Sequence, residues 1–107
     1  ILEVAGNKAE IILDGGILRG SDVIKAIALG ARAVAIGKLQ GWGLAAGGEA
    51  GLLRVLEILE SEIVTTMGLL GIARLDQLTS SYLCKVQPLS LVHEMSTFPH
   101  LPGGQLL

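Results

Sequence analysis

The sequence predicts an α/β fold in which short parallel strands alternate with helices. Two aliphatic runs, Glu10–Leu13 and Ala33–Ile36, have the length and composition of buried strands. Between them, Ser21–Leu29 has the pattern of a short helix, with Ser21 as its expected N-cap and Gly30 directly after its last turn. A strand–helix–strand order of this length predicts two neighbouring parallel strands joined by a crossover.

A long helix is predicted over Glu49–Leu70, after a Gly-rich segment at 39–48 in which a short helical turn is expected. Aliphatic residues recur in this helix at helical spacing. The predicted buried stripe is Leu52, Leu56, Leu59, Ile63, Met67 and Leu70. On this pattern Glu57, Glu60 and Glu62 are interpreted as a solvated face. Leu75–Leu78 is expected to form another short helix.

The chain is expected to divide into residues 1–83, which hold the predicted strands and helices, and an extended tail over 84–107. Prolines and a Gly-Gly pair break regular structure in the tail. Hydrophobic residues make up 50% of the 107 and charged residues only 17%. So aliphatic a chain is expected to bury its apolar faces against structure beyond itself, because a segment of this size buries only part of its own surface. We therefore interpret it as a fragment.

Charge and cysteine content exclude several classes of function. The net charge is −2 and no basic cluster is present, which argues against nucleic acid as a partner. No run approaches the ~18 apolar residues of a membrane span. A single cysteine, Cys84, fits a reducing compartment, and we expect it to be a buried or half-buried small side chain. The final residues, 104–107, are not a peroxisomal Ser-Lys-Leu signal, so a cytoplasmic location is expected.

The most informative motif is the turn that follows the first predicted strand. Its residues are Asp14-Gly15-Gly16-Ile17-Leu18-Arg19. Adjacent glycines let backbone N–H groups approach an anion, and a following helix N-terminus adds donors and a favourable dipole. The second strand ends in Gly37-Lys38, which brings a glycine and a cation to the same edge. Together these features predict a phosphate-binding site, and in (β/α)8 barrels the last two βα loops bind phosphate.

The runs ILDGGILRGSDVIKAIALGARAVAIGK and LAAGGEAGLLRVLEILESEIVTTMGLLG, followed by SYLCKVQPL, resemble the FMN-dependent α-hydroxy-acid oxidases and dehydrogenases. That family includes glycolate oxidase, lactate oxidase and mandelate dehydrogenase. The resemblance implies the C-terminal βαβα portion of a TIM (β/α)8 barrel, with residues 1–83 as its last two βα units. It also implies that FMN is the cofactor. The implied FMN-binding residues are Asp14, Gly15, Gly16, Ile17, Leu18, Arg19, Gly37 and Lys38.

Two positions depart from the family pattern. Leu18 stands where the family has its first arginine, while Arg19 matches the second. Lys38 stands where the family has arginine after the last strand, so the charge is kept and the bidentate fork is lost. Loss of the first arginine removes a charge-assisted hydrogen bond, so two outcomes are open: FMN binding is weaker, or Arg19 turns in to replace the missing arginine.

The resemblance implies oxidation of a 2-hydroxy acid to a 2-oxo acid in the complete protein. The family's catalytic histidine and carboxylate-binding arginine belong to motifs upstream of Ile1, so no catalytic residue and no metal site is expected here; His93 and His100 do not match that histidine. The implied partners are the N-terminal part of the barrel, a small 2-hydroxy acid and, in a homo-oligomer, further copies as a tetramer. Two alternatives remain: another FMN- or phosphate-binding barrel, such as an IMP dehydrogenase-like enzyme, and a non-catalytic fragment that binds a partner.

Overall fold

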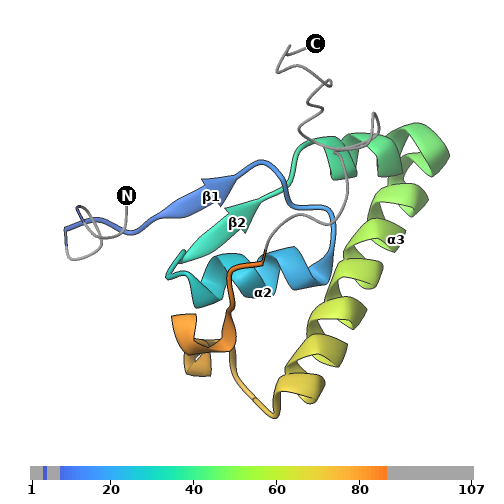
Figure 1. Cartoon of the computed structure of the whole chain (residues 1–107). Helices are drawn as coiled ribbons and strands as arrows, with labels where there is room; N and C mark the ends of the chain where they lie inside the picture. The colour runs from blue at the N-terminus through green and yellow to red at the C-terminus, as the bar shows by residue number, and fades with distance from the viewer. Residues whose placement is uncertain (1–3, 5–7, 87–107) are drawn as a thin grey trace.

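The structure of this protein is a computed structural model that describes residue 4 and residues 8–86. Strands β1 and β2 pair in parallel, with Leu13 opposite Val34, and α2 connects them (Figure 1). The predicted β–α–β order is therefore confirmed. The elements in chain order are β1 (Ile12–Asp14), α2 (Gly20–Ala28), β2 (Ala33–Ala35), α3 (Lys38–Leu70) and the 3-10 helices η1 (Leu75–Gln77) and η2 (Ser80–Tyr82).

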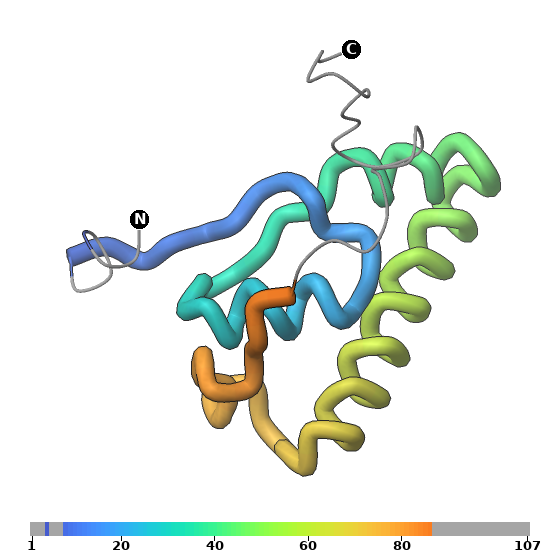
Figure 2. The backbone as a smooth tube through the Cα atoms, viewed as in Figure 1, coloured from blue at the N-terminus to red at the C-terminus, as the bar shows by residue number. Residues whose placement is uncertain are grey.

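Helix α2 lies at the centre of the core and packs on two sides. Towards the strands, Val23 and Ala26 pack with Ile17 and with the partly buried Val34. On its other side α2 packs against the chain that follows α3, where the tube in Figure 2 passes beneath it. The buried residues of that second cluster are Ile24, Ala28, Ile72 and Leu78. One helix thus joins the strand pair to the C-terminal half of the described chain.

The first turn of α2 begins one residue earlier than the sequence predicts. Its N-cap is Arg19 and the helix starts at Gly20, so the prediction of Ser21 as N-cap was wrong. Carboxylates replace the serine: the Arg19 N–H donates to Asp22 Oδ2 (3.0 Å) and the Gly20 N–H donates to Glu62 Oε2 (2.7 Å). The end of the helix follows the prediction, because Gly30 takes a positive φ of 100° directly after the C-cap Leu29.

Helix α3 is longer than predicted and has a sharp bend. Helical structure begins at Lys38, so the Gly-rich segment is helical up to residue 46 and is longer than the expected short turn. The bend lies at Gly47 (φ −158°) and Gly48 (φ 58°, ψ −138°). The positive φ of Gly48 is a conformation that glycine adopts without steric cost. A short first half therefore precedes a long second half that ends at Gly71, whose φ is 70° (Figure 1).

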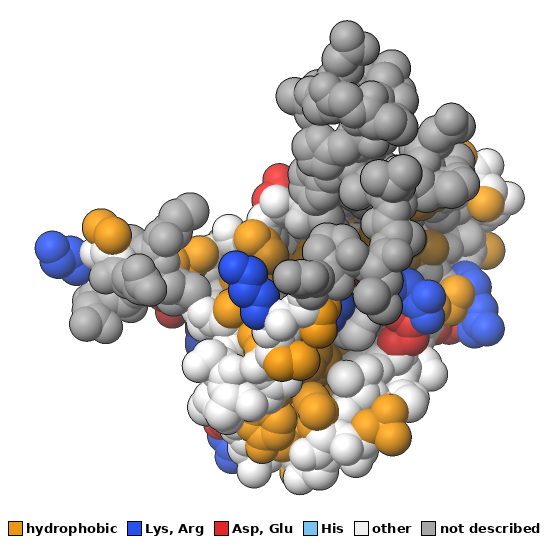
Figure 3. Space-filling model, viewed as in Figure 1, with side chains coloured by type: hydrophobic (Ala, Val, Ile, Leu, Met, Phe, Trp, Pro, Cys, Tyr) orange, Lys and Arg blue, Asp and Glu red, His pale blue; other side chains and the backbone are white. Residues whose placement is uncertain are grey.

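The buried stripe of the second half of α3 differs in part from the prediction. Leu59 is buried, and Ile63, Met67 and Leu70 pack against the core, but Leu56 is 46% exposed. The residues of α3 that pack against the two core clusters are Ile63, Met67 and Leu70, which all lie beyond Leu56. Apolar side chains are visible on the face shown in Figure 3, and Ile12 on β1 is 66% exposed.

Two expectations about the C-terminal residues have different outcomes. Cys84 is exposed in the structure, so the prediction of a buried or half-buried side chain was wrong. Most of the predicted tail, with His93, His100 and the prolines, lies outside the described residues. Within the described part of the chain, no helix combines the length and apolar character needed to cross a membrane.

Candidate functional site

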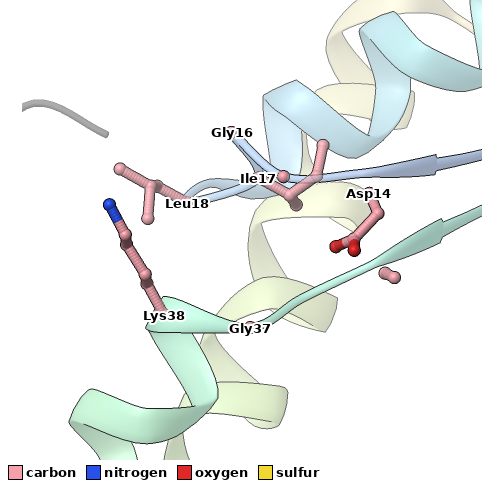
Figure 4. Close-up of a pocket in the computed structure, with 8 residues that line it drawn as sticks. Asp14, Gly16, Ile17, Leu18, Gly37 and Lys38 are labelled. Atoms are coloured by element: carbon pink, nitrogen blue, oxygen red, sulfur yellow. The ribbon is translucent and has the colours of Figure 1, made fainter. Parts of the chain in front are cut away.

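A pocket of about 280 Å³ lies where β1 and β2 end, between the β1–α2 loop and the start of α3 (Figure 4). Seven of the eight residues predicted as FMN-binding line it, and Ala35 of β2 joins them. The lining residues are Asp14, Gly15, Gly16, Ile17, Leu18, Ala35, Gly37 and Lys38. The parallel register explains this meeting, because Asp14 and Ala35 are paired at the carboxyl ends of the two strands.

The glycines of the pocket expose their backbone to it. Gly15 and Gly16 take positive φ values of 92° and 77°, a region that glycine enters without strain. A Cβ built on Gly15 or on Gly37 meets no heavy atom within 4 Å. Both backbones therefore face open space, and a ligand can approach them more closely than it could approach a residue with a side chain.

The N-terminus of α3 forms the second wall of the pocket. Its N-cap, Gly37, makes no side-chain capping hydrogen bond, and the first turn contains no acidic residue. Lys38, the first helical residue, extends its amine towards Leu18 on the facing loop (Figure 4). A helix N-terminus with a cation beside it attracts an anion, because partial positive charge from the helix dipole adds to the lysine charge. Open glycine backbone and this helix end together fit a phosphate group.

Asp14 brings a carboxylate to the same pocket, at the end of β1 (Figure 4). An ionised carboxylate only accepts hydrogen bonds, so it suits a hydroxyl-bearing part of a ligand and repels a phosphate. The pocket thus has two chemically different ends, an acceptor at Asp14 and a cation at Lys38. Among the described residues, no group of three or more side chains could hold a metal ion.

The N-terminus of α2 differs from that of α3, because carboxylates of the chain already occupy it. The N–H groups of Leu18 and Arg19 both donate to Asp22 Oδ2, at 3.2 and 3.0 Å. The N–H of Gly20 donates to Glu62 Oε2 at 2.7 Å. These three successive backbone N–H groups, which the sequence predicted as donors to an anion, are therefore paired with carboxylates of the protein itself. The backbone that remains for a ligand on this side lies before Leu18.

Arg19 is the predicted site residue that the structure places outside the pocket. Its Nε donates to Glu62 Oε1 at 2.8 Å, and its Nη2 lies 2.7 Å from the same oxygen in an ion pair. Glu62 was interpreted as part of a solvated face, which was wrong: its side chain is 25% exposed and both carboxylate oxygens are hydrogen-bonded. The bonds from Arg19 and then from the Gly20 N–H lower the pKa of Glu62, and the same pair raises the pKa of Arg19. No local sequence signal pairs two residues this far apart.

Leu18 contacts two cavities at once. It lines the pocket at the strand ends, and it also lines a small apolar cavity of about 50 Å³ with Leu39 and three residues of the second half of α3. Those three are Val55, Ile58 and Leu59. The leucine that departs from the family pattern therefore covers an apolar crevice, and an arginine at this position would lay its aliphatic stem over the same surface.

A parallel βαβ unit with a pocket at the carboxyl ends of its strands, lined by glycine backbone and a helix N-terminus, has the arrangement of a barrel-type cofactor-binding protein. The sequence model for the FMN-dependent dehydrogenases matches residues 1–85. This chain belongs to the FMN-dependent dehydrogenase family, a family of flavoprotein oxidoreductases whose cofactor is FMN. The Asp-Gly-Gly pattern alone is shared with other phosphate-binding barrels. The match of the family model favours this family over them.

Individual relatives agree with this assignment. The chain is 47% identical over 83 residues to "L-lactate oxidase" of Nostoc sp., and the matched region covers 78% of this chain and 23% of the relative. It is 54% identical over 74 residues to "Pre-mycofactocin synthase" of Mycobacterium tuberculosis, covering 69% and 19%. The recombinant flavin-binding domain of baker's yeast flavocytochrome b2 matches with a TM-score of 0.69 and 36% identity, over 75% of this chain and 21% of that one. The structural neighbours are flavin-binding TIM-barrel domains, and the chain has the fold of a part of such a domain.

The chain thus spans about a fifth of the length of the relatives that it matches. Their names differ, so similarity over this segment does not by itself fix a reaction.

Proposed function

We propose that this chain forms the phosphate-binding end of the FMN site in a larger (β/α)8 barrel that oxidises a 2-hydroxy acid to a 2-oxo acid. The observation that supports the proposal most directly is the meeting of the β1–α2 loop and the α3 N-terminus around one pocket. This is the position at which barrels bind phosphate, after the last strands and at the start of a short extra helix. The first half of α3, before its bend at Gly47–Gly48, corresponds to that extra helix.

Three groups of this chain would hold the cofactor. The backbone of Gly15–Ile17 and that of Gly37 would approach the phosphate, and Lys38 would supply the charge. Asp14 would accept hydrogen bonds from hydroxyl groups of the ribityl chain. When bound, FMN accepts the two electrons removed from the substrate, and the protein contributes position and electrostatics. The described residues include no histidine, so the group that takes the substrate's hydroxyl proton belongs to another part of the protein.

The proposal is tested on the complete protein that contains this chain. After purification with bound flavin, it is mixed without oxygen with L-lactate, glycolate and L-mandelate, and the visible flavin absorbance is followed. We expect one or more of these 2-hydroxy acids to bleach the flavin and to yield the 2-oxo acid. D-Lactate is the matched control, because it has the same groups in the opposite configuration.

Two outcomes would contradict separate parts of the proposal. If the protein contains bound FMN but no 2-hydroxy acid reduces it, the proposed reaction is contradicted and the proposed cofactor site is not. If the protein binds riboflavin as tightly as FMN, the proposed phosphate site is contradicted, because riboflavin lacks the phosphate of FMN.

A further inference from the structure

Glu62 joins the loop of the proposed phosphate site to α3 through two hydrogen bonds and an ion pair. Oε1 accepts from Nε of Arg19 at 2.8 Å and lies 2.7 Å from Nη2 in the ion pair, and Oε2 accepts from the Gly20 backbone N–H at 2.7 Å. The two consecutive residues are thus held by one carboxylate that lies more than forty positions away. A hydrogen bond between charged groups is shorter and stronger than a neutral one, and here both oxygens of the carboxylate are engaged. We name Arg19, Gly20 and Glu62 the clasp.

Direct backbone contact reinforces the clasp. A Cβ built on Gly20 would lie 2.5 Å from Cβ of Glu62 and 2.6 Å from the backbone N of Ile63. The start of α2 therefore touches the backbone of α3, and any larger residue would separate the two helices. The clasp holds because glycine permits this approach.

The β1–α2 loop, which forms one wall of the proposed phosphate site, is short and fixed at both ends. Its C-terminal end is held by the clasp and by Asp22, which accepts the N–H groups of Leu18 and Arg19. Its N-terminal end continues from β1, which pairs with β2. Only Gly15–Ile17 lie between these two attachments, so their orientation follows from where the attachments are placed.

Glu62 also connects the loop to the opposite wall of the pocket, because α3 continues from Gly37–Lys38 through its bend to Glu62. The clasp fixes the loop to the second half of α3, while the first half of α3 carries the residues that face the loop. Glu62 itself lines a different cavity, with Arg19, Ser21, Ser61, Thr65 and Thr66. Its effect on a ligand in the phosphate pocket is therefore indirect.

We infer that Glu62 is a positioning residue for the FMN phosphate: it fixes the β1–α2 loop against α3 and so sets the spacing of the two walls that bind the phosphate. The inference rests on the proposed function. It assigns Arg19 to the clasp rather than to the phosphate, which differs from the role that the family resemblance implied.

The test compares FMN with riboflavin, because only FMN carries the phosphate. In the complete protein, dissociation constants for both flavins are measured by quenching of flavin fluorescence for the wild type, Glu62→Gln and Glu57→Gln. Glu57 is a matched control on the same helix, since its ion pair with Arg54 is exposed. We expect Glu62→Gln to weaken FMN about tenfold, as for loss of a residue that orients a ligand-binding group. Riboflavin affinity is expected to be unchanged, and Glu57→Gln to bind both flavins like the wild type.

Equal loss of FMN and riboflavin binding in Glu62→Gln would overturn the inference, because it would indicate general destabilisation. Retained preference for FMN in this variant would overturn it as well. If the wild type itself shows no preference for FMN, the proposed phosphate site fails first, and the two failures are thereby distinguished.

A double-mutant cycle with Arg19→Gln separates the clasp from direct contact of Arg19 with the phosphate. If the two residues act as one unit, the double variant should bind FMN about as weakly as Glu62→Gln alone. A further loss equal to the full effect of Arg19→Gln would show that Arg19 acts on FMN independently, contrary to the inference. The phosphorus-31 resonance of bound FMN gives a second readout in any variant that still binds, and it should shift in Glu62→Gln but not in Glu57→Gln.

Discussion

Gly51 and Gly43 are in backbone contact across the bend of α3. A Cβ built on Gly51 would lie 2.0 Å from the carbonyl oxygen of Gly43, and one built on Gly43 would lie 2.8 Å from a methyl group of Val55. Neither glycine takes a positive φ, so close approach and not conformational freedom requires them. This contact fixes the short first half of α3, which carries the wall of the pocket at Gly37–Lys38, to the long second half.

Substituting Gly51 with alanine should destabilise the protein. Alanine favours a helix over glycine by roughly 0.5–1 kcal/mol, but a Cβ against a backbone oxygen cannot be relieved by a side-chain rotation. We expect a net loss of about 1–3 kcal/mol in the free energy of unfolding, measured by denaturant titration. Gly68→Ala is the control, because a Cβ there meets no atom within 4 Å, and it should be neutral or slightly stabilising. Equal stability of the two variants would contradict the contact.

Removal of the Lys38 amine should weaken FMN binding. Lys38→Ala deletes the cation that lines the pocket, and loss of a hydrogen bond to a charged group costs roughly 1–3 kcal/mol. The measurement is a fluorescence titration of FMN into the complete protein freed of flavin. Arg54→Ala removes one positive charge outside the pocket and should leave the affinity unchanged. A Lys38→Ala protein with wild-type affinity would place the phosphate elsewhere.

An arginine at position 18 should tighten FMN binding. Leu18 lines both the phosphate pocket and the apolar cavity, so an arginine stem can cover the cavity while its guanidinium enters the pocket. A new charge-assisted hydrogen bond predicts a gain of roughly 1.5 kcal/mol or more. The same titration with riboflavin should show no gain. Leu18→Met is the shape control, and if it tightens FMN as much as Leu18→Arg, the effect is not one of charge.

Stability in acid should depend on Glu62. Its hydrogen bonds with Arg19 and then Gly20 lower its pKa in the folded protein, so the stabilisation is fully present above the unfolded-state pKa of about 4.3. It is lost as the pH falls through the lower folded-state pKa. Denaturant unfolding at several pH values should therefore show Glu62→Gln less stable than the wild type near neutrality, with the difference narrowing below about pH 4. A constant difference across this range would mean that the charge of Glu62 is not what stabilises the clasp.

Expressed alone, the 107-residue chain should self-associate. Ile12 on β1 is 66% exposed and Val64 on α3 is 62% exposed, and the strand pair has open edges. Sedimentation velocity at increasing concentration should show growing species. Ile12→Thr keeps a strand-forming residue, removes exposed apolar surface and should reduce the association. A sharp monomer that does not change with concentration would contradict this expectation.

The sequence by itself determined the order of elements and where the chain turns. Aliphatic runs predicted β1 and β2, and glycines at positions 30 and 71 end α2 and α3 with positive φ. These features depend on residues within a few positions of one another, so local patterns record them. The pocket was predictable for the same reason: parallel strands bring their carboxyl ends to one edge, and the residues following each strand meet there.

The tertiary structure alone decided which of those residues face a ligand. Arg19 was expected at the phosphate, yet it pairs with Glu62, and that same carboxylate takes the place of Ser21 at the start of α2. Leu56 matched the helical stripe but is exposed, and the α3 residues that pack on the core, Ile63, Met67 and Leu70, lie further along. Each outcome depends on a partner distant in sequence. Periodicity and motif spacing describe neighbours along the chain. Whether the Glu62 carboxylate faces solvent or pairs with Arg19 depends on how α2 packs against α3, which local patterns do not record.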